Sequence, residues 1–346
     1  MDYQIKSFGI YAGIDYDEIW VEHDGVIITF SNFGARINRW LVPDSNGEQK
    51  SIVLGFDNAS HAVEGKGYYY GATIAPIAGR VNKGQFTLNN DAYQLTINDG
   101  KNHLHGGHRA VDLQKWDYDV DLTDEQFKVT FSYTWPDGYN GYPGPITMKV
   151  IYSYTFNHTW RIEYVANTEK ATLFNPTNHV YFNLSGNNQE DILKHSLQIN
   201  ADHYLPVLAD GLPQGTIESV TATPFDLREA VVLGTVLNSN FDQVAIKDGF
   251  DHPFYLNESN PKAILSLDEN NIRIECRTSS PCIVVYTSQV VDQPIAIWGQ
   301  AIKKYGGITL ETQMEPDAIN HTNFHDISLY PDQTFHAWTE YQLIKE

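Results

Sequence analysis

Three histidines occupy the short stretch NHLHGGH, as His103, His105 and His108. On an extended strand His103 and His105 would share a face, because successive side chains alternate between the two faces. Together with His108 beyond the Gly–Gly bend, they could supply a metal ion with imidazole ligands. The chain has no H-E-x-x-H motif and no cysteine pair at ligand spacing, so we favour loop histidines, one of which bonds backbone carbonyls. A role in acid/base chemistry would need partners elsewhere in the chain.

A further histidine, His179, lies in the stretch FNPTNHVYFNLSG, which alternates polar and apolar residues. If residues 178–184 are extended, His179 shares a face with Tyr181 and Asn183. The opposite face is apolar and comprises Val180, Phe182 and Leu184. A single histidine beside a tyrosine on a strand is more often structural than catalytic, so this stretch alone does not predict chemistry.

Glu311 lies in the middle of a second alternating stretch, GGITLETQM. Thr309, Glu311 and Gln313 would form one face of a strand, opposite the face of Ile308, Leu310, Thr312 and Met314. By itself, this pattern favours a glutamate on the solvated outer face of a sheet.

Three other polar residues stand singly in short turn-like stretches. Arg80 follows an uncharged run in APIAGRVNKG, Asp251 precedes a His-Pro pair in GFDHPFYL, and Asn175 begins the sequence NPT. Arg80 could pair on the surface, and Asp251 could cap its turn. None of the three predicts a function alone.

The elements that must position these residues are β-strands. In FKVTFSYTW, residues 127–135, aromatic and aliphatic side chains alternate with Lys, Thr and Ser, and MKVIYSYTF, WRIEYVAN and IRIECRT repeat the pattern. Turn clusters such as PDSNG and PDGYNGYPGP separate the strands, and no sustained amphipathic helix is present. We therefore predict an all-β fold, a large antiparallel sandwich or barrel that forms a single domain over residues 1–346.

Composition and charge limit the possible partners. The chain is 42% hydrophobic and 19% charged, which suits a globular core, and its 23 Lys and Arg face 43 Asp and Glu. Because phosphate polyanions bind basic surfaces, we expect neither nucleic acid nor an anionic membrane as a partner. We find no signal-peptide pattern and no membrane-spanning segment, so we expect a cytoplasmic protein. Cys276 and Cys282 are then expected to be reduced structural thiols.

Five motifs taken together resemble one known family. In chain order they are GR at 79–80, LHGG at 104–107, NPTNHVYFNL at 175–184, DHPF at 251–254 and GGITLETQ at 306–313. This set resembles the aldose 1-epimerase, or galactose mutarotase, family, and the resemblance extends from about residue 25 onward. It implies a single large antiparallel β-sandwich whose concave face binds a small hexose, such as D-galactose or D-glucose, and whose reaction interconverts the α- and β-anomers at C1.

The resemblance also implies catalytic roles for three residues. Glu311 matches the family's catalytic base, His179 matches its catalytic acid, and His105 of LHGG matches its other active-site histidine. His103 and His108 match no functional position. The implied site contains no metal and no cofactor.

Substrate binding is implied for another group of residues. Arg80 and Asp251 match positions that contact the sugar, and Asn175 belongs to the same motif as His179. Many members carry Asn-Arg where this chain has Gly79–Arg80, so the contacts around Arg80 are where this chain departs from the family pattern.

The chemistry of anomer exchange agrees with these residue types. A base removes the proton of the C1 hydroxyl while an acid protonates the ring oxygen; the open aldehyde then rotates and closes on its other face. A glutamate and a histidine suit the two tasks, because histidine titrates near neutral pH and burial can raise a glutamate toward it.

Three alternatives remain open on the sequence. A hexose-6-phosphate 1-epimerase should show several cationic residues near the motifs, where only Arg80 stands. A glycoside hydrolase would need two carboxyl groups, which Glu311 and Asp251 could supply. A non-catalytic sugar-binding sandwich would bind a hexose without turnover. The sequence does not distinguish a monomer from a homodimer, nor a preference for galactose from one for glucose.

Overall fold

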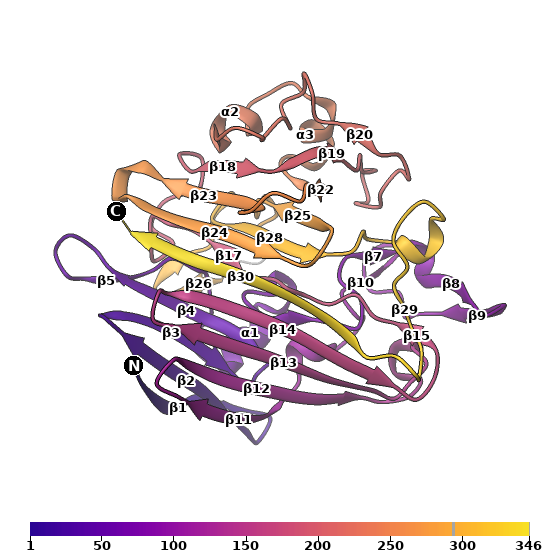
Figure 1. Cartoon of the computed structure of the whole chain (residues 1–346), viewed down its shortest axis with the longest axis horizontal. Coiled ribbons are helices and arrows are strands. Elements are labelled where there is room, and N and C mark those ends of the chain that lie inside the picture. Colours follow the sequence, from indigo (N-terminus) through magenta and orange to yellow (C-terminus); the bar gives the residue numbers. More distant parts are fainter. Residues whose placement is uncertain (293–294, 346) are drawn as a thin grey trace.

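The computed structural model describes residues 1–292 and 295–345, and most of its regular structure is β-strand (Figure 1). This confirms the predicted all-β fold. The helices are short, namely α1 (Ala59–Glu64), α2 (Leu233–Leu237) and α3 (Asp242–Lys247). Single 3₁₀ turns cover Lys66–Tyr68, Asn82–Gly84, Val111–Leu113, Tyr139–Gly141, Asp268–Asn270 and Ala318–Asn320.

The largest sheet in the described part of the chain has nine antiparallel strands. In spatial order they are β11 (Asp117–Leu122), β12 (Gln126–Trp135), β13 (Ile146–Thr155), β14 (Thr159–Thr168), β30 (Phe335–Lys345), β24 (Ile272–Thr278), β23 (Ala263–Leu267), β18 (Ser196–Ile199) and β21 (Val231–Val232). The alternation predicted for β12 is confirmed, since Phe127, Val129 and Phe131 are buried while Lys128 and Thr130 are half-buried. Strand β30 joins the two halves of the sheet by pairing with both β14 and β24.

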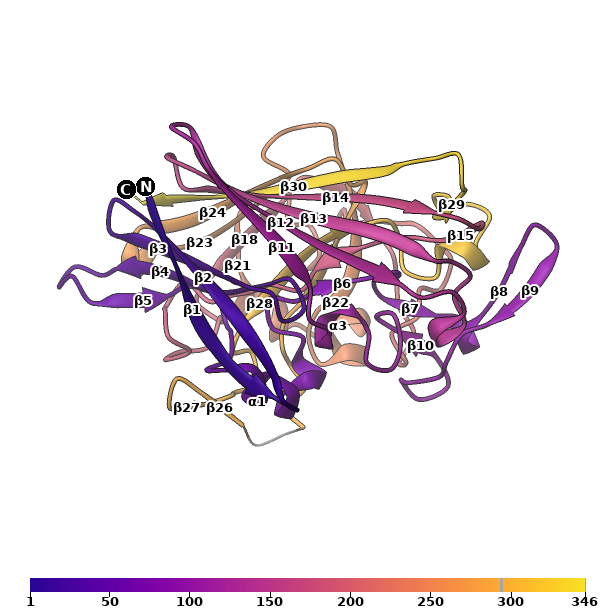
Figure 2. The ribbon, with the colours of Figure 1, turned by 90° about the horizontal axis from the view of Figure 1, so that it is seen from below.

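A six-stranded sheet lies against one face of the nine-stranded sheet, and Figure 2 shows the two as separate layers. Its strands are β17 (Tyr181–Phe182), β28 (Ile308–Gln313), β25 (Cys282–Tyr286), β22 (Asp251–Leu256), β19 (Ala201–Tyr204) and β20 (Glu218–Ser219). Tyr341 of β30 connects the layers: its hydroxyl donates to the Leu310 carbonyl at 2.7 Å, and its ring centroid lies 5.2 Å from that of Phe182. The main hydrophobic core fills the space between the layers.

A five-stranded sheet and several strand pairs complete the fold. The five strands are β1 (Asp2–Tyr11), β2 (Ile14–His23), β3 (Val26–Ser31), β4 (Arg36–Pro43) and β5 (Gln49–Ser51). The pairs are β6 (Thr73–Ile74) with β16 (Thr177–Asn178), β7 (Arg80–Val81) with β10 (His103–Leu104), β8 (Gln85–Leu88) with β9 (Asp91–Gln94), β15 (Thr172–Leu173) with β29 (Ser328–Leu329), and β26 (Ala296–Ile297) with β27 (Gln300–Ala301). The pairing of β7 with β10 brings two of the sequence motifs together.

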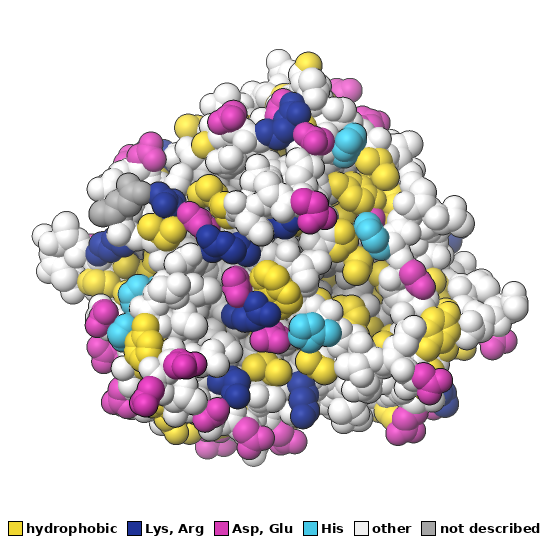
Figure 3. Space-filling view, viewed as in Figure 1, with side chains coloured by type: hydrophobic (Ala, Val, Ile, Leu, Met, Phe, Trp, Pro, Cys, Tyr) yellow, Lys and Arg dark blue, Asp and Glu magenta, His cyan; other side chains and the backbone are white. Residues whose placement is uncertain are grey.

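The outer face of the nine-stranded sheet carries charges of both signs. Arg161 contacts Glu163 at 2.9 Å and Glu340 at 2.7 Å, and Figure 3 shows basic and acidic side chains interspersed over this face. Cys276 and Cys282 are buried and free, as expected. Among the described residues, no helix is long and apolar enough to cross a membrane.

Candidate active site

The strands of the six-stranded sheet divide their side chains between the core and a pocket. The side chains of Tyr181, Asp251, Val284, Tyr286 and Glu311 line the pocket. Side chains on the opposite face of the same strands point into the core, namely Phe182, Ile283, Val285, Ile308 and Leu310. The period-two geometry of a strand therefore builds the floor of the pocket, while the opposite face packs against the nine-stranded sheet.

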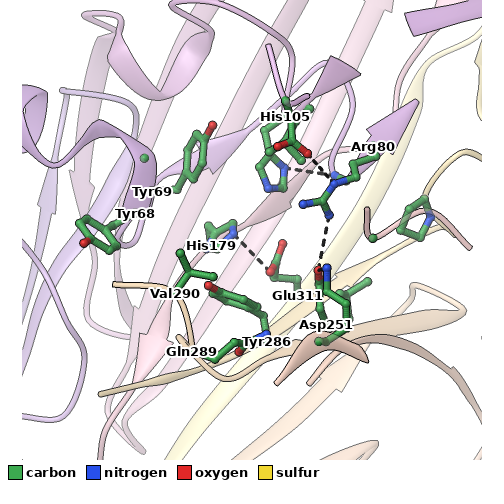
Figure 4. A pocket seen from close by; sticks show the side chains of 18 of the residues that line it. Tyr68, Tyr69, Arg80, His105, His179, Asp251, Tyr286, Gln289, Val290 and Glu311 are labelled. Carbon is green, nitrogen blue, oxygen red and sulfur yellow. Dashed lines mark hydrogen bonds and ion pairs between the residues drawn. The ribbon is translucent and has the colours of Figure 1, made fainter. Parts of the chain in front are cut away.

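Loops and short elements from distant parts of the chain form the walls of the pocket, which has a volume of about 430 Å³ (Figure 4). This volume suits a small molecule. The five residues that the family resemblance singled out most directly all line it, namely Arg80, His105, His179, Asp251 and Glu311. The structure thus brings together residues separated by as many as 231 positions, from Arg80 to Glu311.

Glu311 and His179 are in direct contact at the floor. Nε2 of His179 lies 3.4 Å from Oε1 of Glu311, and the same oxygen accepts a hydrogen bond from the Thr309 hydroxyl at 3.0 Å. Strand register explains the contact: Tyr181 pairs with Thr309 across β17 and β28, so His179 and Glu311, two residues further in each direction, face each other. Glu311 is 3% exposed, which corrects the expectation, drawn from its stretch alone, of a solvated outer face.

Burial shifts the pKa values of Glu311 and His179 in opposite directions. Burial raises the pKa of Glu311 to about 8, although the Thr309 hydrogen bond opposes the shift. Burial lowers the pKa of His179 to about 4. Between these values the pair holds one proton, which belongs to both groups together rather than to either residue. At neutral pH the site therefore contains one proton donor and one proton acceptor in contact.

His105 is held as a neutral hydrogen-bond donor. Its Nδ1 accepts a hydrogen bond from the Gly79 backbone N–H at 3.1 Å, so the ring proton resides on Nε2. Burial lowers the pKa of His105 well below its usual value, and the nearby His179 and Arg80 act in the same direction. The ring lies against that of His179, with centroids 5.2 Å apart (Figure 4).

The LHGG segment is a turn, and this corrects the expectation that His103 and His105 share a strand face. Strand β10 ends at Leu104, and His105 has a left-handed backbone with φ of 50°. Gly106 continues the turn with φ of 80°, and a Cβ atom there would lie 2.3 Å from the Ala75 carbonyl oxygen. The turn sends His105 into the pocket and leaves His103 outside its lining.

His103 has a structural role, as expected for one of the loop histidines. Its Nδ1 donates to the Thr96 carbonyl at 2.7 Å, and its Nε2 accepts from the Tyr142 hydroxyl at 2.7 Å. His108 is exposed. Within residues 1–292 and 295–345, no group of three or more His, Cys, Asp or Glu side chains is arranged to hold a metal ion.

Arg80 lies between two carboxylates on the wall of the pocket. Its Nε donates to Asp99 at 2.7 Å, and its Nη1 lies 3.5 Å from Oδ2 of Asp251. Nζ of Lys247, at the end of α3, lies 3.0 Å from the same oxygen. Burial alone would raise the pKa of Asp251, but Arg80 and Lys247 outweigh it and hold the pKa below its usual value. Asp251 is therefore an ionised acceptor inside the pocket.

Asn175 differs from the substrate contact that we expected. It is 1% exposed and is not among the residues that line the pocket. Its side-chain amide donates to the Met314 carbonyl at 3.1 Å and accepts from the Met314 N–H at 2.9 Å. These bonds tie the segment before His179 to the end of β28, so Asn175 supports the pocket from behind.

Several pocket residues were not identified from the sequence. Tyr69, with a left-handed backbone, places its ring 4.9 Å from that of His105 and 5.5 Å from that of His179. Tyr286, Asp99 and Lys247 also line the pocket. The run GYYYG around Tyr69 is an aromatic signal typical of sugar sites, and Lys247 stands four residues before Asp251; the sequence shows both features but not where they lie.

Comparisons with known proteins point to one family. A family model described as aldose 1-epimerase matches residues 17–342. A galactose mutarotase of Rattus norvegicus is 35% identical over 327 residues, which cover 93% of this chain and 92% of the relative. An aldose 1-epimerase of Haemophilus influenzae is 32% identical over 345 residues, covering 97% and 98%. The crystal structure of a galactose 1-epimerase from Lactobacillus acidophilus matches with a TM-score of 0.88 and 32% identity, covering 99% of this chain and 98% of the other.

Proposed function

Because this chain belongs to the aldose 1-epimerase family, whose members are carbohydrate isomerases, we propose that it interconverts the α- and β-anomers of a free hexose. One observation carries the proposal: the buried contact of 3.4 Å between His179 and Glu311 on the pocket floor. The two oxygens that exchange protons in this reaction are both bonded to C1. A base and an acid that serve them must therefore lie side by side, as these two residues do.

The proton count of the pair fits the reaction. The reactive form has Glu311 ionised and His179 protonated, and it differs from the alternative one-proton form only by transfer of that proton across the contact. Glu311 then removes the proton of the C1 hydroxyl while His179 protonates the ring oxygen, and the ring opens to the aldehyde. After rotation about the C1–C2 bond the two transfers run in reverse. Each is typically worth ~10²–10⁴ in rate.

The other pocket residues hold the sugar. His105 offers a fixed Nε2–H donor beside His179, and Asp251 offers an ionised acceptor held by Arg80 and Lys247. Tyr69 and Tyr286 supply aromatic surface for the apolar faces of a sugar ring. A donor, an acceptor and aromatic surface around one acid/base pair suit a neutral polyhydroxylated ring.

An unphosphorylated sugar is the substrate that the charges favour. The two cationic residues that line the pocket, Arg80 and Lys247, are already paired with carboxylates, and Glu311 and Asp292 add further acidic groups. A phosphate group requires cations free to bind it. A hexose 6-phosphate should therefore be turned over far less efficiently than the free hexose.

Polarimetry of freshly dissolved α-D-galactose and α-D-glucose tests the proposal. Added protein should accelerate the change in optical rotation of at least one sugar, without release of any product. Binding without acceleration would indicate a sugar-binding protein instead. Release of reducing ends from a glycoside would indicate a hydrolase, and comparable efficiency on hexose 6-phosphates would indicate the phosphate-specific reaction.

A further inference from the structure

Two glutamines among the described residues line the pocket, and they differ in their hydrogen bonding. The amide of Gln289 is bonded to the protein at both ends: Nε2 donates to the Phe250 carbonyl at 2.9 Å, and Oε1 accepts from the Thr287 hydroxyl at 2.9 Å. Gln313 is 2% exposed, and neither its Nε2 nor its Oε1 has a hydrogen-bond partner among the described residues. A buried amide without partners destabilises the fold unless something else bonds it.

The position of Gln313 sets it apart from its neighbours on the same face of β28. Thr309 donates to Glu311, and Glu311 contacts His179. Glu315, beyond the end of the strand, accepts hydrogen bonds from the Tyr255 hydroxyl and from His325. Gln313 stands between these bonded groups with both polar atoms of its amide unsatisfied. Among the described residues that line the pocket, the other buried side-chain polar atom without a partner is Nδ1 of His179.

The distance of Gln313 from the proposed reaction centre matches the size of a sugar. Residues two apart on a strand are separated by about 6–7 Å. Gln313 is two residues from Glu311 on the same face, so the Cα atoms of the two residues are separated by about the width of one pyranose ring. An amide both donates and accepts hydrogen bonds, as a sugar hydroxyl does.

We propose that Gln313 hydrogen-bonds a sugar hydroxyl remote from C1 and thereby contributes to the choice among hexoses. This inference rests on the proposed function, because it takes C1 to lie at Glu311. The chain keeps an unsatisfied amide in the pocket floor, and the correct hexose satisfies it. An analogue that lacks the hydroxyl leaves the amide buried without a partner.

A double-mutant cycle between protein and sugar tests the proposal. Mutarotation of D-galactose and of its 2-, 3-, 4- and 6-deoxy analogues is measured with the wild-type protein and with Gln313→Met, a substitution of similar length without the amide. For one analogue altered at C3, C4 or C6, the wild type should lose about tenfold or more in kcat/KM, and Gln313→Met should lose about twofold or less. Equal losses for every analogue in both proteins would overturn the proposal and assign the amide to water or to structure.

Thermal unfolding without sugar provides a second, independent readout. Gln313→Met removes no protein hydrogen bond, so its Tm should equal or exceed that of the wild type. Gln289→Met, the matched control, breaks two hydrogen bonds and should lower Tm by about 2 °C or more. A drop of the same size for Gln313→Met would show a structural role and overturn the proposal. If the wild type itself does not accelerate mutarotation, the proposed function fails first, and the deoxy-sugar comparison is replaced by calorimetric binding of the same sugars.

Discussion

Strands β12 and β28 show the same alternation in sequence but have different surroundings. Along β12, buried aromatic and aliphatic residues alternate with half-buried polar ones such as Lys128 and Thr130. Along β28, every residue is buried on both faces. The polar face of β12 meets solvent, whereas Thr309, Glu311 and Gln313 of β28 lie beneath loops that come from elsewhere in the chain.

Comparison of the two strands shows how the surroundings of a strand determine the properties of the charged residues on its polar face. Alternation fixes which side chains share a face, but what covers that face is decided by residues distant in sequence, such as Tyr69 and His105. Lys128 keeps its hydration and makes a surface contact with Asp121 at 3.3 Å. Glu311 loses its hydration, and burial raises its pKa to about 8. Covering the polar face of a strand therefore changes its chemistry without changing its local pattern.

The largest expected effect on activity is that of a substitution on the buried polar face of β28. Glu311→Gln keeps the shape and hydrogen-bonding capacity of the side chain but removes its basicity, so kcat should fall by roughly 10²–10⁴ while the affinity for hexose changes little. The measurement is mutarotation kinetics together with calorimetric binding. A correctly folded variant with near wild-type kcat would show that another group, such as Asp251 or His105, is the base.

The pH dependence of the rate should be determined by the protonation of the buried pair Glu311 and His179. The pair holds one proton between the pKa of His179, about 4, and that of Glu311, about 8. We therefore expect kcat/KM to be bell-shaped, falling about tenfold per pH unit below the first value and above the second. Rates measured from acidic to alkaline buffers test this. A single inflection near the ordinary pKa of histidine would mean that His179 titrates without its partner.

The burial of Glu311 should also make the folding stability depend on pH, and the direction of this dependence follows from the raised pKa. The pKa of Glu311 is raised in the folded state above its ordinary value of 4.5, so folding favours its protonated form. The stability that this provides is complete below pH 4.5 and is lost as the pH rises through about 8. The side chain that Glu311→Gln introduces does not titrate, so the Tm of the variant relative to the wild type should increase between about pH 4.5 and about pH 8 and then level off. A Tm difference that is constant with pH would contradict the burial of an ionisable group here.

The smallest effect is expected at the exposed face. Lys128→Gln on β12 makes the same kind of change, from a charged side chain to an amide on the polar face of a strand. Because Lys128 is solvated, the free energy of unfolding should change by about 0.5 kcal/mol or less, and mutarotation should be unaffected. Urea unfolding and polarimetry measure both. A large loss of activity would show that the polar face of β12 influences the pocket formed by the polar face of β28.

The alternation of polar and apolar residues predicted the strands and which side chains share a face. It did not predict which loops lie over each face. The alternation correctly placed the core side of β12 and grouped His179 with Tyr181. The combined motifs identified five of the residues that line the pocket, whereas Tyr69, Asp99, Lys247 and Tyr286 were not identified. The sequence predicted a bend at Gly106–Gly107 but not the left-handed backbone of His105, one residue earlier, nor the close approach of Gly106 to the Ala75 carbonyl oxygen. The backbone contacts of Asn175 could not be anticipated either, because they require the end of β28 to lie beside it.

The position of β30 has a consequence for how the molecule assembles. In the part of the chain that the structure describes, strands β11 to β14 and strands β18, β21, β23 and β24 form two halves of the large sheet that are joined by strand pairing only through β30, residues 335–345. Because residues 335–345 follow the other strands of this sheet in the chain, they are synthesised after them, and the facing edges of the two halves stay unpaired until then. The same strand presents Tyr341 to the Leu310 carbonyl, so the strand that carries Glu311 gains this contact only when residues 335–345 have been synthesised. Nascent chains stalled before residue 335 should be protease-sensitive in β28, whereas those that include residues 335–345 should be protected.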